Sequence, residues 1–347
     1  MLRTKAFQFR GIENWAREIV TEHLVSPGAS LCELWCGLGT EFGKWQRRKV
    51  ARYLGVDGGS FSLEQAKEVW ASRQMDRLCR GTFLQKNPLM EEIVDPNHPE
   101  ELNFDHVVAY RNFSDAFEAP ELLEKLLENV SMLLKDGGYF FGYCADSSKI
   151  WLDAVLSKRP LHISRPLFTL QVIPPGMDVS ADGIASTTTT AASSSALGMD
   201  VDAVKGEENE ESHNATRDPC PVFGTQFTLR VDGEENTSTE YLVNFPALLR
   251  CAERHSLEMV EIMNLQELFE TYRPFHEEMA VNFSVYKGDS RKIDKEQQHL
   301  VALFAVFVFR KRGQREGEDE MVAVEGSTSR PHLNTHSQPS RPPPLPR

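Results

Sequence analysis

The stretch SLCELWCGLGTEFGKW at residues 30–45, followed by RYLGVDGG at residues 52–59, decides the fold of this chain. A short apolar run, Leu31–Trp35, breaks into a turn that holds two glycines. A second apolar run, Tyr53–Val56, ends in the acid Asp57. In a doubly wound sheet, bare glycine backbone lets a ligand come close, and a carboxylate after the second strand holds the two hydroxyls of a ribose. The pattern therefore predicts a nucleotide-type site, although glycine turns and acids after strands also occur without any ligand.

The glycine spacing argues against a nicotinamide cofactor. In the turn that contains Gly37 and Gly39, the next glycine is Gly43, one place late for the dinucleotide pattern. Glu41 would open the next helix and repel a pyrophosphate. S-adenosylmethionine has no phosphate and carries a sulfonium cation, so a turn rimmed by acids fits it better. Glu33, inside the first strand, is expected to face the methionine end; alternatively, both acids are simply solvated.

Composition divides the chain into one folded region and two polar segments. The 347 residues carry a net charge of −13, which does not imply a broad nucleic-acid patch. Residues 174–220 hold nine acids against two cations and lack apolar periodicity, so they are predicted to be a disordered insertion. We expect a folded domain over residues 1–311, interrupted by that insertion. A proline-rich disordered tail over 312–347 is expected either to bind an SH3-type or WW-type groove or to be a plain flexible end.

The six cysteines form no C-x-x-C pair and lie mostly in apolar runs, where they are expected to be small buried hydrophobes. No signal-peptide core begins the sequence and no apolar run is long enough for a membrane span. We therefore expect an intracellular protein that makes no membrane contact and is a monomer. The histidines are scattered, and the sequence contains neither a Ser-His-Asp arrangement nor a metal-ligand cluster, so no metal is expected.

Strand-like and helix-like segments alternate along the chain. Helices are predicted at 11–24, 62–71, 120–134, 246–255 and from 266, the third ended by Asp136–Gly138. Strands are predicted at 31–35, 52–56, 81–85, 104–110, 139–143, 223–231, 241–245, 257–263 and 299–310. This βαβ alternation argues for a parallel sheet. The later strands, of which the last is long and apolar, match the Rossmann-like, seven-stranded, mostly parallel sheet with an antiparallel last strand of class I S-adenosylmethionine-dependent methyltransferases.

A more specific resemblance is carried by six segments whose order and spacing agree. They are ENW (13–15), CGLGTEFGKW (36–45), DGGYFFG (136–142), ADSSKIW (145–151), PVFG (221–224) and EYLVNFPAL (240–248). With them the chain resembles the mRNA cap guanine-N7 methyltransferases, and especially their divergent second plant type, over residues 8–311 outside the insertion. The resemblance implies methyl transfer from S-adenosyl-L-methionine to guanine N7 of the mRNA 5′ cap. It also implies capped mRNA as the partner and the nucleus as the location.

The resemblance carries over to individual positions on the cofactor side. The implied cofactor-binding residues are Arg17, Glu33, Gly37, Gly39, Asp57, Asn87 and Tyr110. Glu33 stands where the family has an aspartate, and Trp35 where the glycine motif has its first glycine. Leu38 and Thr40 replace a lysine and the last glycine.

On the cap side, the implied residues are Asn14, Ser114, Asp115, Glu240 and Phe304. Ser114 and Asp115 replace a His-Tyr pair of the family, whereas Glu240 is kept and suits the N1 and N2 donors of guanine. Guanine N7 has a free lone pair and no proton to remove, so alignment alone serves the reaction and no catalytic base is expected. Two alternatives stay open: a degenerate relative that acts as a cofactor-binding or RNA-binding scaffold, and a methyltransferase with another substrate.

Overall fold

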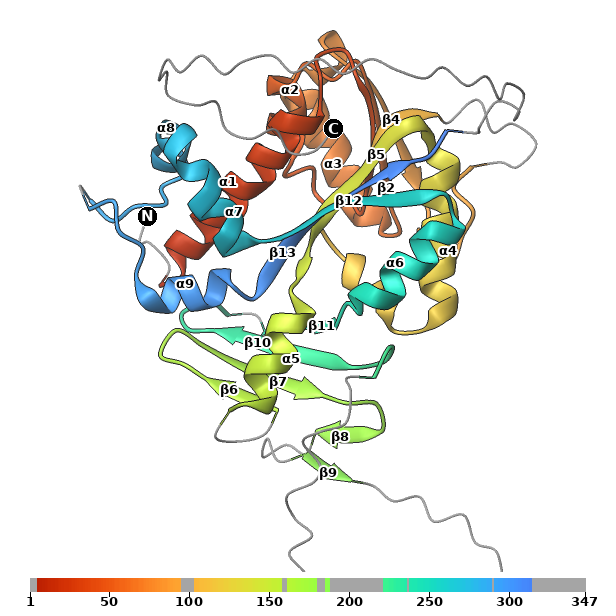
Figure 1. The fold of residues 1–347 in the computed structure, drawn as a ribbon. Helices are drawn as coiled ribbons and strands as arrows, with labels where there is room; N and C mark the ends of the chain where they lie inside the picture. Colours follow the sequence, from red (N-terminus) through yellow and green to blue (C-terminus); the bar gives the residue numbers. More distant parts are fainter. Residues whose placement is uncertain are drawn as a thin grey trace, which may run out of the picture.

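The computed structural model describes residues 5–94, 103–157, 161–179, 185–187, 221–235, 237–288 and 290–313. Its centre is a seven-stranded sheet in the order β12-β13-β5-β4-β1-β2-β3 (Figure 1). The strands of this sheet are β1 (Ser30–Leu34), β2 (Arg52–Asp57), β3 (Arg80–Gln85), β4 (Phe104–Ala109), β5 (Leu134–Ala145), β12 (Leu257–Asn264) and β13 (Phe304–Lys311). The helices are α1 (Phe7–Leu24), α2 (Phe42–Arg47), α3 (Ser60–Ser72), α4 (Pro120–Leu133), α5 (Ser147–Val155), α6 (Phe245–Arg254), α7 (Leu265–Tyr272), α8 (Glu277–Asn282) and α9 (Lys295–Val301). Three short 3₁₀ helices are η1 (Met75–Arg77), η3 (Phe113–Phe117) and η4 (Arg273–Phe275).

The strand directions confirm the predicted class I methyltransferase sheet. β1 pairs in parallel with both β2 and β4, and the parallel pairing continues outward to β3 and β5. β13, the last strand among the described residues, lies between β5 and β12 and runs antiparallel to both. Because the parallel strands end at one edge, the loops after β1, β2, β3 and β4 gather there, where ligands bind in such sheets.

Both faces of the sheet are covered by helices, which explains its apolar strands. Successive strand residues point to opposite faces, so Phe140 and Phe141 of β5 enter two different core clusters. One cluster takes in α1, α2, α3 and α7, and the other takes in α4 and α6. The apolar residues that recur at helical spacing along α1 are all buried: Ile12, Trp15, Ile19, Val20 and Leu24.

A second, antiparallel sheet lies below the main one in Figure 1, next to α5. It has the order β11-β10-β7-β6, with β6 (His162–Ser164), β7 (Phe168–Ile173), β10 (Gln226–Val231) and β11 (Thr237–Tyr241). A separate ribbon pairs β8 (Met177–Val179) with β9 (Ala185–Thr187). This ribbon lies at the start of the predicted acidic insertion; residues 188–220 of that insertion and residues 314–347 of the predicted tail lie outside the described residues.

Three predicted elements differ from the structure. Residues 295–301 form α9, so the strand predicted at 299–310 begins only at Phe304. The glycines after α4 do not form a loop, because β5 starts directly at Leu134 and contains them; Gly137 has a positive φ of 78° there, which only glycine adopts easily. The hairpin partner predicted at 241–245 lies at Thr237–Tyr241, since Asn244 already caps α6 by accepting a hydrogen bond from the backbone of Ala247.

The cysteines match their expected role in the part of the chain that the structure describes. Cys32, Cys36, Cys79, Cys144 and Cys251 are free and buried. Within that same part, no helix combines the length and the apolar character that crossing a bilayer requires.

Candidate functional site

The turn after β1 has one glycine open to a ligand and one required by packing. Gly37 and Gly39 have positive φ values of 53° and 75°. A Cβ on Gly37 would meet only the carbonyl oxygen of Trp35, at 4.0 Å, so this backbone faces open space. A Cβ on Gly39 would lie 2.2 Å from the ring of Phe42. Gly37 is therefore accessible to a ligand, while Gly39 makes room for the first residue of α2.

Asp57, at the end of β2, joins two loops at the carboxyl edge of the sheet. Its Oδ2 accepts a hydrogen bond from the backbone nitrogen of Gly37 at 2.9 Å, and its Oδ1 accepts one from that of Gly59 at 2.8 Å. An ionised carboxylate has about four acceptor positions. Two further donors, such as the hydroxyls of a ribose, can therefore still bind to Asp57.

Trp35 occupies a backbone conformation that normally belongs to glycine. Its φ is +54°, in the left-handed region where a bulky side chain is strained. The indole is half-buried and packs against the core cluster beneath α4 and α6. The chain therefore keeps the backbone shape of a glycine turn although Trp35 stands at its first glycine position.

Glu33 has internal partners. It is buried, and its Oε2 accepts hydrogen bonds from Trp45 Nε1 and Tyr53 Oη, both at 2.8 Å. Burial, reinforced by the nearby charge of Glu41, raises the pKa of Glu33 to about 8. Glu33 is neither solvated nor part of the cavity wall described below, so the expectation that it faces a ligand receives no support from its position.

A buried network of alternating charges connects α1 with α2. Arg17 is paired with Glu13 and, at 3.1 Å, with Glu41, and Glu41 is also paired with Lys44. Burial alone would raise the pKa of Glu41, but Lys44 and Arg17 lower it below its usual value. Glu41 is thus a buried, ionised group held by two cations, and not the solvated helix-start residue that the sequence allowed.

The same network extends to the second sheet through Arg10. Its Nε and Nη2 donate to the two carboxylate oxygens of Glu234, at 3.0 and 2.6 Å, in the turn between β10 and β11. Its Nη1 donates to Glu13 at 3.1 Å. Arg10 therefore connects the β10–β11 turn to the ion pairs that surround Arg17.

A cavity of about 260 Å³ brings predicted cofactor residues and predicted cap residues together. Its wall consists of Glu13, Arg17, Tyr110, Arg111, Asn112, Phe113, Ser114, Asp115, Tyr143, Cys144, Thr239 and Glu240. Glu240, from β11, accepts a hydrogen bond from Ser114 Oγ at 3.2 Å. Burial raises the pKa of Glu240, only partly offset by that hydrogen bond. The cavity therefore contains a shielded carboxylate opposite the start of η3.

Aromatic rings shape the cavity wall around Arg17 and Tyr110. Tyr110 donates to the backbone oxygen of Arg17 at 3.1 Å, and its ring stacks parallel to Trp45 with centroids 6.4 Å apart. The Arg17 guanidinium lies 5.1 Å from the centroid of the Tyr143 ring. Tyr143 in turn stacks on Phe304 at 5.2 Å. Phe304 is therefore buried in the core behind the wall and does not line the cavity, as a cap-binding residue would have to.

Five other predicted residues also lie outside this wall: Gly37, Gly39 and Asp57 near the ends of β1 and β2, together with Asn14 and Asn87. Asn14 is half-buried on α1 and does not line the cavity. Asn87 follows β3 at the same sheet edge as Asp57, but its Oδ1 accepts from the backbone of Leu89 at 3.0 Å and so caps its own loop. The structure thus brings together five of the predicted residues, Arg17, Tyr110, Ser114, Asp115 and Glu240, in one cavity wall.

Seven wall residues were not predicted, among them Glu13, Arg111 and Tyr143. Glu13 lies four positions before Arg17, and an opposite-charge pair at this helical spacing was a usable signal. Arg111 is exposed at the cavity and donates to Thr40 Oγ1, at 3.0 Å, in the glycine turn. No sequence signal marked Tyr143 as a site residue, because a single tyrosine in an apolar strand does not indicate which loops will surround it.

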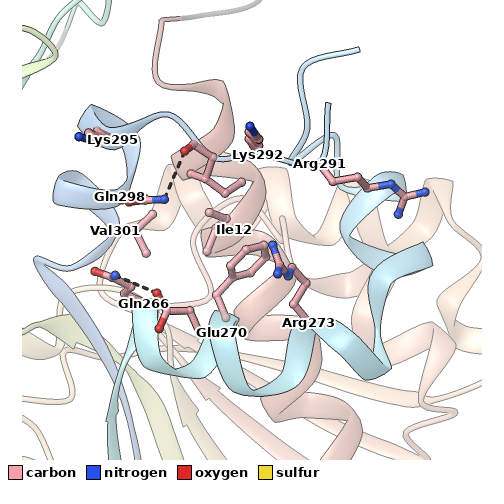
Figure 2. Close-up of a pocket in the computed structure, with 11 residues that line it drawn as sticks. Ile12, Gln266, Glu270, Arg273, Arg291, Lys292, Lys295, Gln298 and Val301 are labelled. Atoms are coloured by element: carbon pink, nitrogen blue, oxygen red, sulfur yellow. Dashed lines mark hydrogen bonds between the residues drawn. The ribbon is translucent and has the colours of Figure 1, made fainter. Parts of the chain in front are cut away.

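A different cavity, of about 580 Å³, lies between α1, α7 and α9 (Figure 2). Its rim carries four basic side chains, Arg273, Arg291, Lys292 and Lys295. None of the predicted site residues lines it. The two cavities are therefore distinct, and the candidate site is the smaller one at the carboxyl edge of the sheet.

Comparison with known proteins agrees with this geometry. The sequence matches the mRNA (guanine-N(7))-methyltransferase domain over residues 2–165 and 172–312. The chain belongs to this family. It is 26% identical to the mRNA cap guanine-N(7) methyltransferase 2 of Oryza sativa subsp. japonica over 298 residues, covering 86% of this chain and 78% of that protein. It is also 26% identical to the protein of the same name from Arabidopsis thaliana, covering 86% and 76%, and 25% identical to the mRNA cap guanine-N(7) methyltransferase of Schizosaccharomyces pombe, covering 88% and 76%.

The family and its fold imply binding of S-adenosylmethionine, and the residues present fit that group. The backbone of Gly37 is open, and Asp57 retains free acceptor positions at the end of β2. Two buried polar atoms of cavity-wall residues, Arg17 Nε and Tyr143 Oη, have no hydrogen-bond partner among the described residues. Buried polar groups are nearly always paired, so a polar ligand in the cavity is compatible with these two atoms. Three residues of the turn, Trp35, Leu38 and Thr40, depart from the family's motif.

Proposed function

We propose that this chain transfers the methyl group of S-adenosylmethionine to guanine N7 of the mRNA 5′ cap. The observation that carries the proposal is the single cavity in which Arg17 and Tyr110 meet Ser114, Asp115 and Glu240. The first two were assigned to the cofactor and the last three to the cap. A transfer between two bound molecules requires their sites to adjoin, because the reacting atoms must come within about 3–3.5 Å.

Glu240 reads the guanine edge in this proposal. Its carboxylate accepts hydrogen bonds from the N1 and N2 donors, which adenine lacks as a pair. A buried acceptor left without those donors costs free energy, so the site rejects other bases. Methylation makes the guanine ring cationic, and the nearby negative charge of Glu240 stabilises that developing charge.

The cofactor side of the proposal uses the loops after β1 and β2. Asp57 holds the ribose hydroxyls, and the backbone of Gly37 permits close approach. Arg17, a residue of the cavity wall, is held in place by Glu13 and Glu41. When bound, S-adenosylmethionine supplies a methyl group on a sulfonium, a ready leaving group, so none of these residues has to remove a proton.

Arg111 is assigned to the triphosphate bridge of the cap. It is exposed at the cavity wall, and its hydrogen bond to Thr40 holds it beside the glycine turn. A guanidinium suits phosphate oxygens because it presents several donors in one plane. Capped mRNA is then the partner and the nucleus the location that this function requires.

A second candidate function is a scaffold that binds the cofactor or RNA without turnover. The observation that favours it is Trp35, a bulky residue at φ +54° at the first glycine position of the turn. Calorimetric titration with S-adenosylmethionine separates the candidates. If S-adenosylmethionine does not bind, the proposal of a methyltransferase is wrong. If it binds but its methyl group is transferred to no acceptor, the chain acts as a scaffold.

The deciding experiment is transfer of labelled methyl from S-adenosylmethionine to GpppN-capped RNA, with ApppN-capped RNA as the base control. Glu240→Gln keeps the size of the side chain and removes its charge. We expect transfer to fall about 10²–10³-fold, the scale of losing one positioned electrostatic group, with cofactor affinity unchanged. Glu235→Gln, an exposed neighbour in the same hairpin, is the matched control. If transfer and guanine preference survive Glu240→Gln, the cap pocket lies elsewhere.

A further inference from the structure

Three side chains with metal-ligating atoms meet between α4 and α6, outside the cavity described above. They are Glu124 from α4, Cys251 from α6 and His255, the residue that directly follows α6, and one ligand atom of each lies within 4.8 Å of the others. Cys251 lies in the last turn of α6, and His255 caps the end of that helix four positions later. His255 Nε2 lies 2.7 Å from Glu124 Oε2.

We propose that Glu124, Cys251 and His255 form a binding site for a divalent zinc ion. Thiolate, imidazole and carboxylate are all ligands of zinc, and a mixture that includes one thiolate favours zinc over the harder cations magnesium and calcium. Three protein ligands leave the fourth tetrahedral position for water. The chemistry is a simple exchange, in which the Sγ–Zn bond forms while the thiol proton leaves to solvent.

The geometry requires only small side-chain movements. Tetrahedral zinc with bonds of about 2.0–2.3 Å separates its ligand atoms by about 3.4–3.6 Å. The three atoms thus need to shift by roughly 1 Å, with the Glu124–His255 contact opening and the sulfur closing in. Cys251 is buried, whereas the side chains of Glu124 and His255 are 41% and 21% exposed. The ion can therefore enter from the solvent side and reach the sulfur last.

The competing explanation is that ordinary polar contacts account for the cluster. Glu124 is also paired with Arg254, and its contact with His255 satisfies both groups without a metal. That explanation leaves Cys251 as a small apolar residue with no part in the cluster. The two explanations therefore differ in whether the sulfur of Cys251 binds an ion.

The site has a structural consequence, because α6 begins directly after β11. Asn244 caps α6 only four residues after Glu240. An ion that joins α6 to α4 would fix the position of the chain that leaves the cavity. The zinc site does not depend on the proposed methyl transfer, and its test does not use that activity.

The test uses the full-length protein, stripped with a chelator and then titrated with zinc and, as a spectroscopic probe, cobalt. We expect one zinc per chain after gel filtration, a thiolate-to-cobalt charge-transfer band, and a melting temperature raised by roughly 5 °C at zinc about 100-fold above the dissociation constant. Cys251→Ser and His255→Gln should each weaken zinc binding at least about tenfold. Changing a residue that only hydrogen-bonds to a metal ligand already lowers metal affinity by about this factor, and losing the ligand itself should lower it at least as much. Cys251→Ser should also abolish the cobalt band.

Cys79→Ser is the matched control, since Cys79 is a free buried cysteine in the other core cluster; it should leave zinc binding unchanged. Circular dichroism checks that each variant is folded, and His255→Gln provides the decision if Cys251→Ser does not fold. The proposal is overturned if the wild-type protein retains no zinc, or if zinc affinity survives in a folded variant at either position. A cobalt spectrum without a thiolate band also overturns it.

Discussion

At the scale of single residues, Glu33 gives the protein an expected dependence of stability on pH. Its pKa of about 8 in the folded state lies above that of an exposed glutamate, so the folded state binds the proton more tightly than the unfolded state. The stabilising contribution is complete below about pH 4.5 and is lost as the pH rises to about 8. Glu33→Gln, which keeps the acceptor for Trp45 and Tyr53, should therefore become more stable relative to wild type by a few kcal/mol over this range.

Urea unfolding at pH 5, 6.5 and 8.5 measures this difference. Glu64→Gln, on the exposed face of α3, is the control and should show no such trend. A constant difference between Glu33→Gln and wild type across the three pH values would contradict the proposed burial of a protonated Glu33.

Asp57 is expected to contribute directly to cofactor affinity. Asp57→Ala removes the acceptor for the ribose hydroxyls and also frees the backbone nitrogens of Gly37 and Gly59. Affinity for S-adenosylmethionine should fall at least about tenfold, the scale of losing a pair of charge-assisted hydrogen bonds. Isothermal calorimetry measures the affinity, and the melting temperature shows how far the turn itself is disturbed. Unchanged affinity would remove Asp57 from the site.

Glu240 should set the acid limb of the pH–rate profile. It has to be ionised to accept both guanine donors, and burial raises its pKa above that of an exposed glutamate. Methyl transfer should therefore decline as the pH falls through that raised pKa, while Glu240→Gln should have a low rate without this limb. Initial rates with saturating cofactor from pH 5 to 8 provide the measurement. An identical acid limb in both proteins would assign it to another group.

At the scale of elements, α1 holds the β10–β11 hairpin in place. Arg10 binds Glu234 through two nitrogens, and this hairpin carries Glu240 into the cavity. Arg10→Lys keeps the charge but cannot make both bonds in one plane. We expect KM for capped RNA to rise about three- to tenfold, which is the effect expected from weakening a half-exposed charged hydrogen bond. Cofactor affinity should stay unchanged.

Lys5→Ala tests a neighbouring ion pair, to Asp232 in the same hairpin turn. Both partners are largely exposed, so little change is expected. Steady-state kinetics on GpppN-RNA compare the two variants. If Arg10→Lys alters only kcat, or if both variants behave alike, Arg10 does not position the hairpin.

At the scale of the whole molecule, the acidic segment should be dispensable for folding. Residues 188–220 have a composition that cannot bury enough apolar surface to offset the entropy of ordering them. The replacement should spare residues 174–187, because they contain the paired strands β8 and β9 and because Pro175 lies near Gly224. With a short Gly/Ser linker in place of 188–219, the melting temperature should change by no more than about 2 °C. A larger fall would show that the segment packs on the domain.

The sequence by itself determined the class of fold and the family. Alternating strand and helix patterns, the glycine turn and Asp57 are local signals, because periodicity and backbone freedom act over a few residues. They correctly predicted a parallel sheet, and the match to class I methyltransferases correctly added its seven strands and the antiparallel last strand. Local signals did not predict the ends of the elements correctly. For example, the first residues of the strand predicted at 299–310 belong to α9.

Only the tertiary structure decided which residues share the site. Glu240 and Ser114 are 126 positions apart in the sequence and meet because the second sheet folds against η3. Glu33 and Phe304 were predicted at the ligand, but the packing of α2 and of Tyr143 encloses them in the core. The partners of a side chain depend on how whole helices and strands pack together. This packing is set by the burial of both faces of the sheet, and a local sequence pattern carries no information about it.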